Sequence, residues 1–191
     1  MSGDATGDPA GDSIGDPAPI SQEPYLAMSD SGPVLRLPAA MREALEAYAP
    51  EFRPWRLEEY EVEAAAHAGP PERLPLFGTI GDFNADGVRD VALQGHDAAQ
   101  EYFVVLLSDG AVFRAVELYR QPYHPDPDGP GRAAYLRRAP PGKVDVPPML
   151  ESLEGPAPEL VGDGIVEVFE GQASTLYYWK DGRFVRYITG D

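Results

Sequence analysis

Oxygen-bearing side chains recur at close, regular spacing in the stretch Gly81-Asp82-Phe83-Asn84-Ala85-Asp86-Gly87-Val88-Arg89-Asp90. Asp82, Asn84 and Asp86 stand at every second position, and Asp90 ends the run. A hard cation such as Ca²⁺ takes about 6–8 oxygen ligands at roughly 2.3–2.6 Å. We therefore predict that this loop binds Ca²⁺ through the side chains of Asp82, Asn84, Asp86 and Asp90 and the carbonyl of Val88.

The length of the loop separates it from the standard helical calcium motif. Gly87 stands at the sixth position, where the chain turns sharply and a positive φ is cheap only for glycine. The twelve-residue EF-hand loop needs an acidic residue at its last position, which is Leu93 here. The alternative is a turn without metal, because Asp, Asn and Gly favour turns. The carboxylates of Asp82, Asp86 and Asp90 would repel one another in such a turn, so we favour the cation.

The pattern Asp-x-Asn-x-Asp-Gly-x-x-Asp resembles the short calcium loop of FG-GAP and VCBS-type repeats, found in integrin-type β-propellers and bacterial surface proteins. In those families the loop lies between two strands. The flanking segments Phe77-Gly78-Thr79-Ile80 and Val91-Ala92-Leu93-Gln94 have the apolar character of such strands. The resemblance implies a calcium-binding, extracytoplasmic protein. It covers one loop only, whereas those families carry several copies.

The composition limits the other classes of function. The chain has 191 residues, 43% of them hydrophobic, and a net charge of −17, so a folded core is expected and a nucleic-acid-binding surface is not. There is no cysteine, which excludes disulfides and thiolate metal sites. No apolar run has the length of about 18 residues that a membrane-spanning helix needs.

The first 21 residues form an acidic, glycine- and proline-rich segment in which Gly-Asp recurs every four residues. Such a segment has too few apolar side chains to offset the entropy of ordering, so we predict a disordered tail or tether. Tethers of this kind follow the lipidated cysteine of bacterial lipoproteins, and a lipid anchor in the native form is one hypothesis. A plain solvated tail is the other. We expect residues 22–191 to form a single β-rich domain.

One helix and several hairpins should build this domain. A helix is predicted to start at Leu37-Pro38 and to end near Ala49, with Met41, Leu45 and Tyr48 on one face against a sheet. Residues 56–66 fit either a strand or a helix, and we favour a strand. Asp109-Gly110 predicts a central hairpin between residues 101–107 and 111–119, pairing Leu107 with Val112.

The C-terminal third should contain an irregular segment followed by more strands. Residues 121–149 are rich in proline and are interpreted as a long loop; His124, Asp126 and Asp128 within it form an alternative metal site that the neighbouring prolines disfavour. Residues 164–169, 174–179 and 184–188 are predicted strands, the last two joined at Asp181-Gly182. Tyr177 and Trp179 share a face with Phe184 and Ile188. We expect this row to pack in the core with Trp179 largely buried; stacking on sugar rings is the alternative.

No catalytic motif was found: the chain lacks Gly-x-Ser-x-Gly, His-Glu-x-x-His and a phosphate-binding glycine loop. His67, His96 and His124 are interpreted as solvated surface residues. The sequence therefore predicts an α+β, β-rich fold with an N-terminal helix on an antiparallel sheet. We expect a non-catalytic, calcium-stabilised, extracytoplasmic binding or scaffold module with an unknown protein or carbohydrate partner. The alternative is a hydrolase with an unrecognised carboxylate site.

Overall fold

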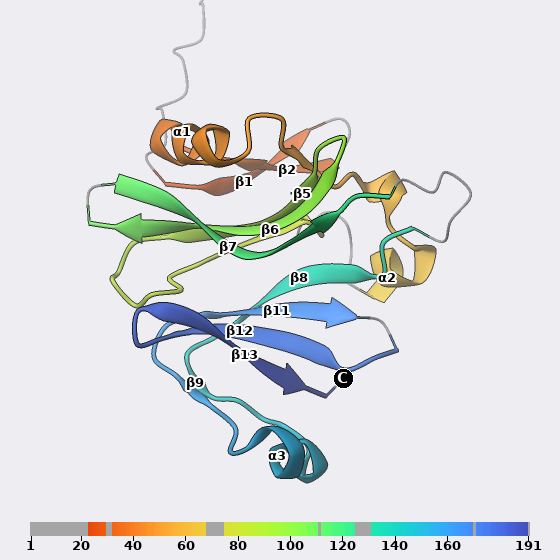
Figure 1. The fold of residues 1–191 in the computed structure, drawn as a ribbon, viewed down its shortest axis with the longest axis vertical. Helices are drawn as coiled ribbons and strands as arrows, with labels where there is room; N and C mark the ends of the chain where they lie inside the picture. The colour runs from red at the N-terminus through yellow and green to blue at the C-terminus, as the bar shows by residue number, and fades with distance from the viewer. Residues whose placement is uncertain are drawn as a thin grey trace, which may run out of the picture.

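Two antiparallel sheets, one above the other in Figure 1, form the centre of the protein. The computed structural model describes residues 23–29, 32–67, 75–110, 112–124, 131–169 and 171–190. The predicted tail of residues 1–21 and the candidate ligands Asp126 and Asp128 lie outside these ranges. The helix α1 and the hairpin β1–β2 lie on the outer side of the upper sheet, and α3 lies at the opposite end of the molecule (Figure 1). The β-rich α+β fold is confirmed.

The upper sheet holds the predicted calcium loop at one of its turns. Its strand order is β3-β5-β6-β7, and β4 pairs with part of β5. The strands are β3 (Arg53–Pro54), β4 (Gly78–Gly81), β5 (Asp90–His96), β6 (Gln100–Asp109) and β7 (Val112–Pro122). Strands β5 and β6 are almost completely buried, as their near-continuous apolar sequences require. The strands expected on either side of the loop are thus confirmed.

The lower sheet has the order β13-β12-β11-β8. Its strands are β8 (Ala134–Ala139), β11 (Gly164–Phe169), β12 (Ser174–Lys180) and β13 (Arg183–Thr189). The predicted C-terminal strands and their Asp-Gly turn are confirmed, and Asp181 takes a positive φ of 51° in that turn. Trp179 packs against Phe184 with ring centroids 5.0 Å apart, but it is only partly buried, less than we expected.

Side chains from both sheets meet in a shared core. Phe83, Phe103, Leu136 and Ile165 are each at most 1% exposed and belong to one cluster. A second cluster lies on the outer side of the upper sheet, where Met41 of α1 contacts apolar residues of β5 and β6. The two sheets therefore hold each other in place by burial of apolar surface, which is the main stabilising term in folding.

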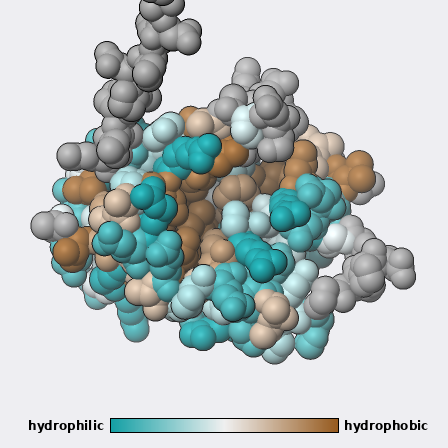
Figure 2. All heavy atoms as spheres, turned by 90° about the horizontal axis from the view of Figure 1, so that it is seen from above, coloured by the Kyte–Doolittle hydropathy of each residue, from teal (hydrophilic) through white to brown (hydrophobic). Residues whose placement is uncertain are grey.

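The predicted N-terminal helix is present as α1 (Ala39–Tyr48), preceded by Pro38 and followed by Ala49. The hairpin of β1 (Tyr25–Ser29) and β2 (Gly32–Arg36) lies beside it (Figure 1). Figure 2 looks onto this side, where apolar atoms gather along a hollow. A groove of about 380 Å³ on this side is lined by Val34, Leu45 and Phe52, among others.

Two predictions of secondary structure are wrong. Residues 56–66 form the short helices η1 (Leu57–Glu59) and α2 (Val62–His67) rather than a strand; the run of alanines after Val62 favours a helix. The segment 121–149 is not one irregular loop: β7 extends to Pro122, β8 begins at Ala134, and β9 (Gly142–Lys143) and α3 (Pro148–Glu154) follow. Strand β9 pairs with β10 (Glu159–Leu160).

The register of the central hairpin also differs from the prediction. Asp109 pairs with Val112, so Leu107 lies opposite Arg114 rather than Val112. An irregularity between Phe103 and Val104 then shifts the pairing once more, and β7 forms an edge of the sheet instead of a central strand. Local turn residues predict that a hairpin exists, but the register also depends on how both faces pack.

Candidate functional site

The predicted calcium loop connects β4 to β5, and the pairing of Gly81 with Asp90 closes its base. The carboxylate of Asp82 lies inside the loop, where it accepts the backbone N–H groups of Asp86 at 3.0 Å and Gly87 at 2.9 Å. Gly87 has a φ of +84°, as the sharp turn requires, and Ala85 also has a positive φ of 61°. The loop thus winds its backbone around the side chain of its first residue.

The middle of the loop is hydrogen-bonded to Ser108, near the end of β6. Asp86 accepts hydrogen bonds from the Ser108 hydroxyl at 2.6 Å, the Val88 N–H at 2.8 Å and the Asn84 amide at 3.0 Å. Burial acts to raise the pKa of Asp86, but these donors outweigh it and hold the pKa below its ordinary value. The Asn84 amide also donates to the Ser108 carbonyl at 3.0 Å. Asp86 is therefore held in its ionised form.

Asp90 is the most deeply buried member of the loop, with no solvent exposure. Its carboxylate accepts the backbone N–H of Ser108 at 2.7 Å and that of Phe83 at 2.8 Å. Burial raises the pKa of Asp90 to about 6, while the two N–H donors act to lower it. Asp90 thus joins the loop to two strands of the upper sheet.

A second loop, which precedes β11 of the lower sheet, is hydrogen-bonded to the first. The backbone N–H of Asp163 donates to the Asp82 carbonyl at 2.7 Å, and the Asp163 carboxylate accepts the Asp82 N–H at 2.9 Å. A Cβ at Gly162 would lie 2.6 Å from that Asp82 carbonyl, so only glycine allows this approach. This contact was not predicted from the sequence, although Gly162-Asp163-Gly164 indicates a turn just before an apolar strand.

The donor set of the loop suits a hard cation, because Asp82, Asn84, Asp86, Asp90 and the Val88 carbonyl offer only oxygens and each carboxylate has several lone pairs. The arrangement of these side chains is less suited to a cation. In the described part of the chain, no three His, Cys, Asp or Glu side chains gather as a metal-binding group. Asp82, Asn84 and Asp86 lie around the loop, whereas Asp90 faces buried N–H groups. The types of ligand therefore fit Ca²⁺, whereas the described side chains are not gathered around one point.

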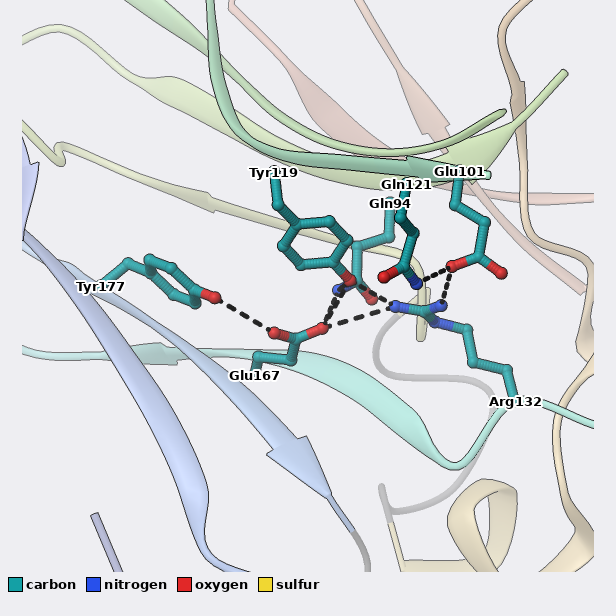
Figure 3. A network of polar contacts seen from close by, with 7 residues as sticks. All are labelled: Gln94, Glu101, Tyr119, Gln121, Arg132, Glu167 and Tyr177. Atoms are coloured by element: carbon teal, nitrogen blue, oxygen red, sulfur yellow. Dashed lines mark hydrogen bonds and ion pairs between the residues drawn. The ribbon is translucent and has the colours of Figure 1, made fainter. Parts of the chain in front are cut away.

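A second polar site, which the sequence analysis missed, lies between the two sheets. Glu167 of β11 is 2% exposed and faces the upper sheet (Figure 3). Its Oε1 accepts the Gln94 amide at 2.5 Å and the Tyr119 hydroxyl at 2.8 Å, and its Oε2 accepts the Tyr177 hydroxyl at 3.4 Å. Burial raises the pKa of Glu167, and its hydrogen-bond donors and Arg132 oppose the rise.

Arg132, just before β8, links two carboxylates of this network. Its guanidinium lies 3.4 Å from Glu167 on one side and 3.4 Å from Glu101 on the other, and Gln121 donates to the same Glu101 oxygen at 2.7 Å (Figure 3). The side chains of Arg132, Glu101 and Glu167 are 11%, 18% and 3% exposed. A charged residue within the apolar run Ile165-Val166-Glu167-Val168-Phe169 was the available signal, because a buried charge needs a partner.

This network forms part of a cleft of about 1070 Å³ that both sheets and the segment around Trp55 line. His96 stacks between Trp55 and Tyr123, with ring centroids 4.5 and 4.3 Å away, and its Nε2 lies 3.4 Å from Glu59. The expectation that His96 is a solvated surface residue is therefore wrong. His124 is exposed at the cleft, as expected, and the side chain of His67 lies outside the described part of the chain.

Two positions of chemical interest thus emerge, the loop and the cleft. Among the described residues no helix is long and apolar enough to cross a membrane. Comparison with known proteins finds no family model, no curated protein and no solved structure that matches this chain. The resemblance of the loop to FG-GAP and VCBS-type repeats therefore rests on the residues of the loop alone.

Proposed function

We propose that this protein is a non-catalytic binding module in which Ca²⁺, held by the loop from Asp82 to Asp90, stabilises the joint between the two sheets. The observation that carries the proposal is the position of the loop. Its first residue is hydrogen-bonded to Asp163, which directly precedes β11 of the lower sheet, and its last residue is hydrogen-bonded to Ser108 of the upper sheet. A cation in this loop would therefore act on both sheets at once.

Electrostatics supports the same conclusion. Asp82, Asp86 and Asp90 place three carboxylates within nine residues, in a chain that already carries a net charge of −17. A divalent cation removes this repulsion and offsets the burial of Asp90. Mg²⁺ is less suited, because it demands near-octahedral geometry and retains its waters.

Calorimetric titration and thermal unfolding of chelator-treated protein test the proposal. Free Ca²⁺ at about 100 times its Kd adds roughly 2.7 kcal/mol to the stability of the folded state, so the Tm should rise by several degrees. Asp82→Asn should remove most of the rise, while Asp145→Asn, an exposed aspartate away from the loop, should not. Absence of both heat and thermal shift up to about 10 mM Ca²⁺, well above the weakest class of extracellular sites, would refute the calcium site.

An extracytoplasmic location, with a lipid tether as one form of attachment, belongs to the same proposal. It is supported by the acidic Gly/Pro composition of residues 1–21 and by the resemblance of the loop to those of bacterial surface proteins. Extracellular Ca²⁺ sites are weak, with Kd of roughly 10⁻⁴–10⁻³ M. Fractionation of the native organism tests this part, and recovery of the protein only from cytosol would contradict it.

A second candidate function is hydrolysis in the cleft. It is favoured by one observation: Glu167, with a raised pKa, and Glu101 flank the same guanidinium. Two carboxyl groups in different environments are the usual basis of acid–base roles. Release of nitrophenol from a panel of nitrophenyl glycosides, lost in Glu167→Gln, would favour hydrolysis over simple binding.

A further inference from the structure

The cleft between the sheets offers hydrogen-bond acceptors that the protein itself does not use fully. Both hydrogen bonds to Glu101 end on its Oε2, one from Gln121 and one from Arg132, so its Oε1 takes none of the described bonds. The carboxylate oxygen of Glu167 on the lower-sheet side has a single contact, to Tyr177 at 3.4 Å. A ligand in the cleft would therefore meet open acceptors.

Two residues that line the cleft also carry buried hydrogen-bond donors without partners. The indole N–H of Trp55 and the Nε–H of Arg132 are buried and have no acceptor, and Trp55 is only 6% exposed. Both residues line the cleft. Leaving a buried donor unpaired costs roughly 1–3 kcal/mol. The site thus lacks acceptors for its donors and donors for its acceptors.

Aromatic faces and the charge balance narrow the ligand further. Trp55, Tyr123 and Tyr177 line the cleft, and the Arg132 guanidinium lies 5.3 Å from the Trp55 ring centre. The cleft is lined by four carboxylates and two guanidinium groups, those of Glu58, Glu59, Glu101 and Glu167 and of Arg132 and Arg186. An anionic ligand would be repelled by this excess.

We propose that this cleft binds a neutral oligosaccharide. A hydroxyl group both donates and accepts hydrogen bonds, so sugar hydroxyls can donate to the open acceptors of the cleft and accept from the tyrosine hydroxyls that line it. The apolar faces of sugar rings suit the partly exposed rings of Tyr123 and Tyr177. The volume of about 1070 Å³ slightly exceeds the usual range for small-ligand sites, which favours several rings over one. This inference rests on the binding-module part of the proposed function and supplies its ligand class.

Titration with three neutral trisaccharides, cellotriose, maltotriose and chitotriose, tests the inference by calorimetry and tryptophan fluorescence. We expect at least one to bind. Glu101→Gln should weaken that binding by about tenfold or more, or roughly 1.4 kcal/mol, because the amide replaces an open acceptor oxygen. Thr175→Trp, on β12 opposite Glu167, should abolish binding by filling the cleft. Glu46→Gln, on exposed α1, is the matched control and should bind as the parent does.

Other results overturn the proposal. These are no binding of any trisaccharide up to about 10 mM, an affinity of only about −2.7 kcal/mol, or binding that both cleft variants retain. Preferential binding of the diamine cadaverine, lost in Glu101→Gln, would instead assign the cleft to an organic cation. Circular dichroism first establishes that each variant folds. If Thr175→Trp does not fold, the result for Glu101→Gln alone decides the test. The calcium response of Glu101→Gln should be unchanged, so failure of glycan binding is separable from failure of the calcium loop.

Discussion

The loop and the cleft hold their carboxylates in opposite ways. In the loop, Asp82 and Asp86 accept backbone N–H groups from residues no more than five positions away in the chain. In the cleft, Glu167 is held by Gln94, 73 positions away, and by Tyr119, 48 positions away. Most of the loop can therefore be predicted from a short stretch of sequence. The cleft exists only after both sheets have packed.

This difference has an energetic consequence. The loop carboxylates are held by neutral N–H and O–H donors and, in the proposed function, would gain from an added cation. The two cleft carboxylates already share an internal cation, Arg132, buried with them. Adding or removing a cation should therefore change the stability of the loop. The stability of the cleft network should instead depend on substitutions of its own residues.

The largest effect should follow from Arg132→Ala, which leaves the buried Glu167 and the partly buried Glu101 without their cation. Breaking a buried ion pair from one side costs roughly 3–5 kcal/mol, and chemical denaturation with urea measures it. Arg183→Ala, an exposed arginine at the start of β13, is the control and should leave the midpoint nearly unchanged. Equal, small effects of the two substitutions would mean that the network does not hold the sheets together.

A smaller but clear loss is expected for Gly162→Ala, which tests the contact between the two loops. The added Cβ would lie 2.6 Å from the Asp82 carbonyl and 3.0 Å from the Ala85 nitrogen. Because both neighbours are backbone atoms, overpacking of about 1–3 kcal/mol should result. If the loop binds Ca²⁺ as proposed, the calcium affinity should also fall, because the proposed ligand Asp82 is displaced. Gly171→Ala is a poor comparison because of its positive φ of 68°, so Ala173→Gly serves as the surface control. Unchanged calcium affinity would show that calcium binding does not depend on the contact between the two loops.

The pH dependence of stability should reveal Glu167. Because burial raises the pKa of this carboxyl in the folded state, its contribution to stability is full at low pH and is lost as the pH rises through the folded-state pKa. Relative to Glu167→Gln, the native protein should therefore become less stable as the pH rises above the ordinary carboxyl range. Urea unfolding of both proteins at several pH values measures this. A difference that stays constant with pH would mean that Glu167 titrates normally.

The smallest effect is expected for removal of residues 1–20. Their composition gives them little apolar surface to pack, so the change in stability should be about 0.5 kcal/mol or less, and the Tm should move by less than about 2 °C. Differential scanning calorimetry of the shortened chain is sufficient. A fall of more than about 5 °C, equivalent to more than 1 kcal/mol, would indicate that this segment docks on the sheets.

The sequence by itself determined the local elements. The helix with Met41 on its buried face, the strands on both sides of the loop and the Asp181-Gly182 turn could be predicted, because residue spacing and turn chemistry act within a few residues. The candidate ligands of the loop were readable for the same reason.

Only the tertiary structure decided how these elements meet. The pairing of Leu107 with Arg114, the strand β8 within a proline-rich segment and the contact of Gly162 with Asp82 all depend on residues far apart in the chain. The same holds for the cleft, where Glu101, Arg132 and Glu167 come from three separate segments. Side-chain period and turn preference carry no information on which distant strand packs opposite. Burial of the shared core between the sheets fixes that choice, and with it the second site.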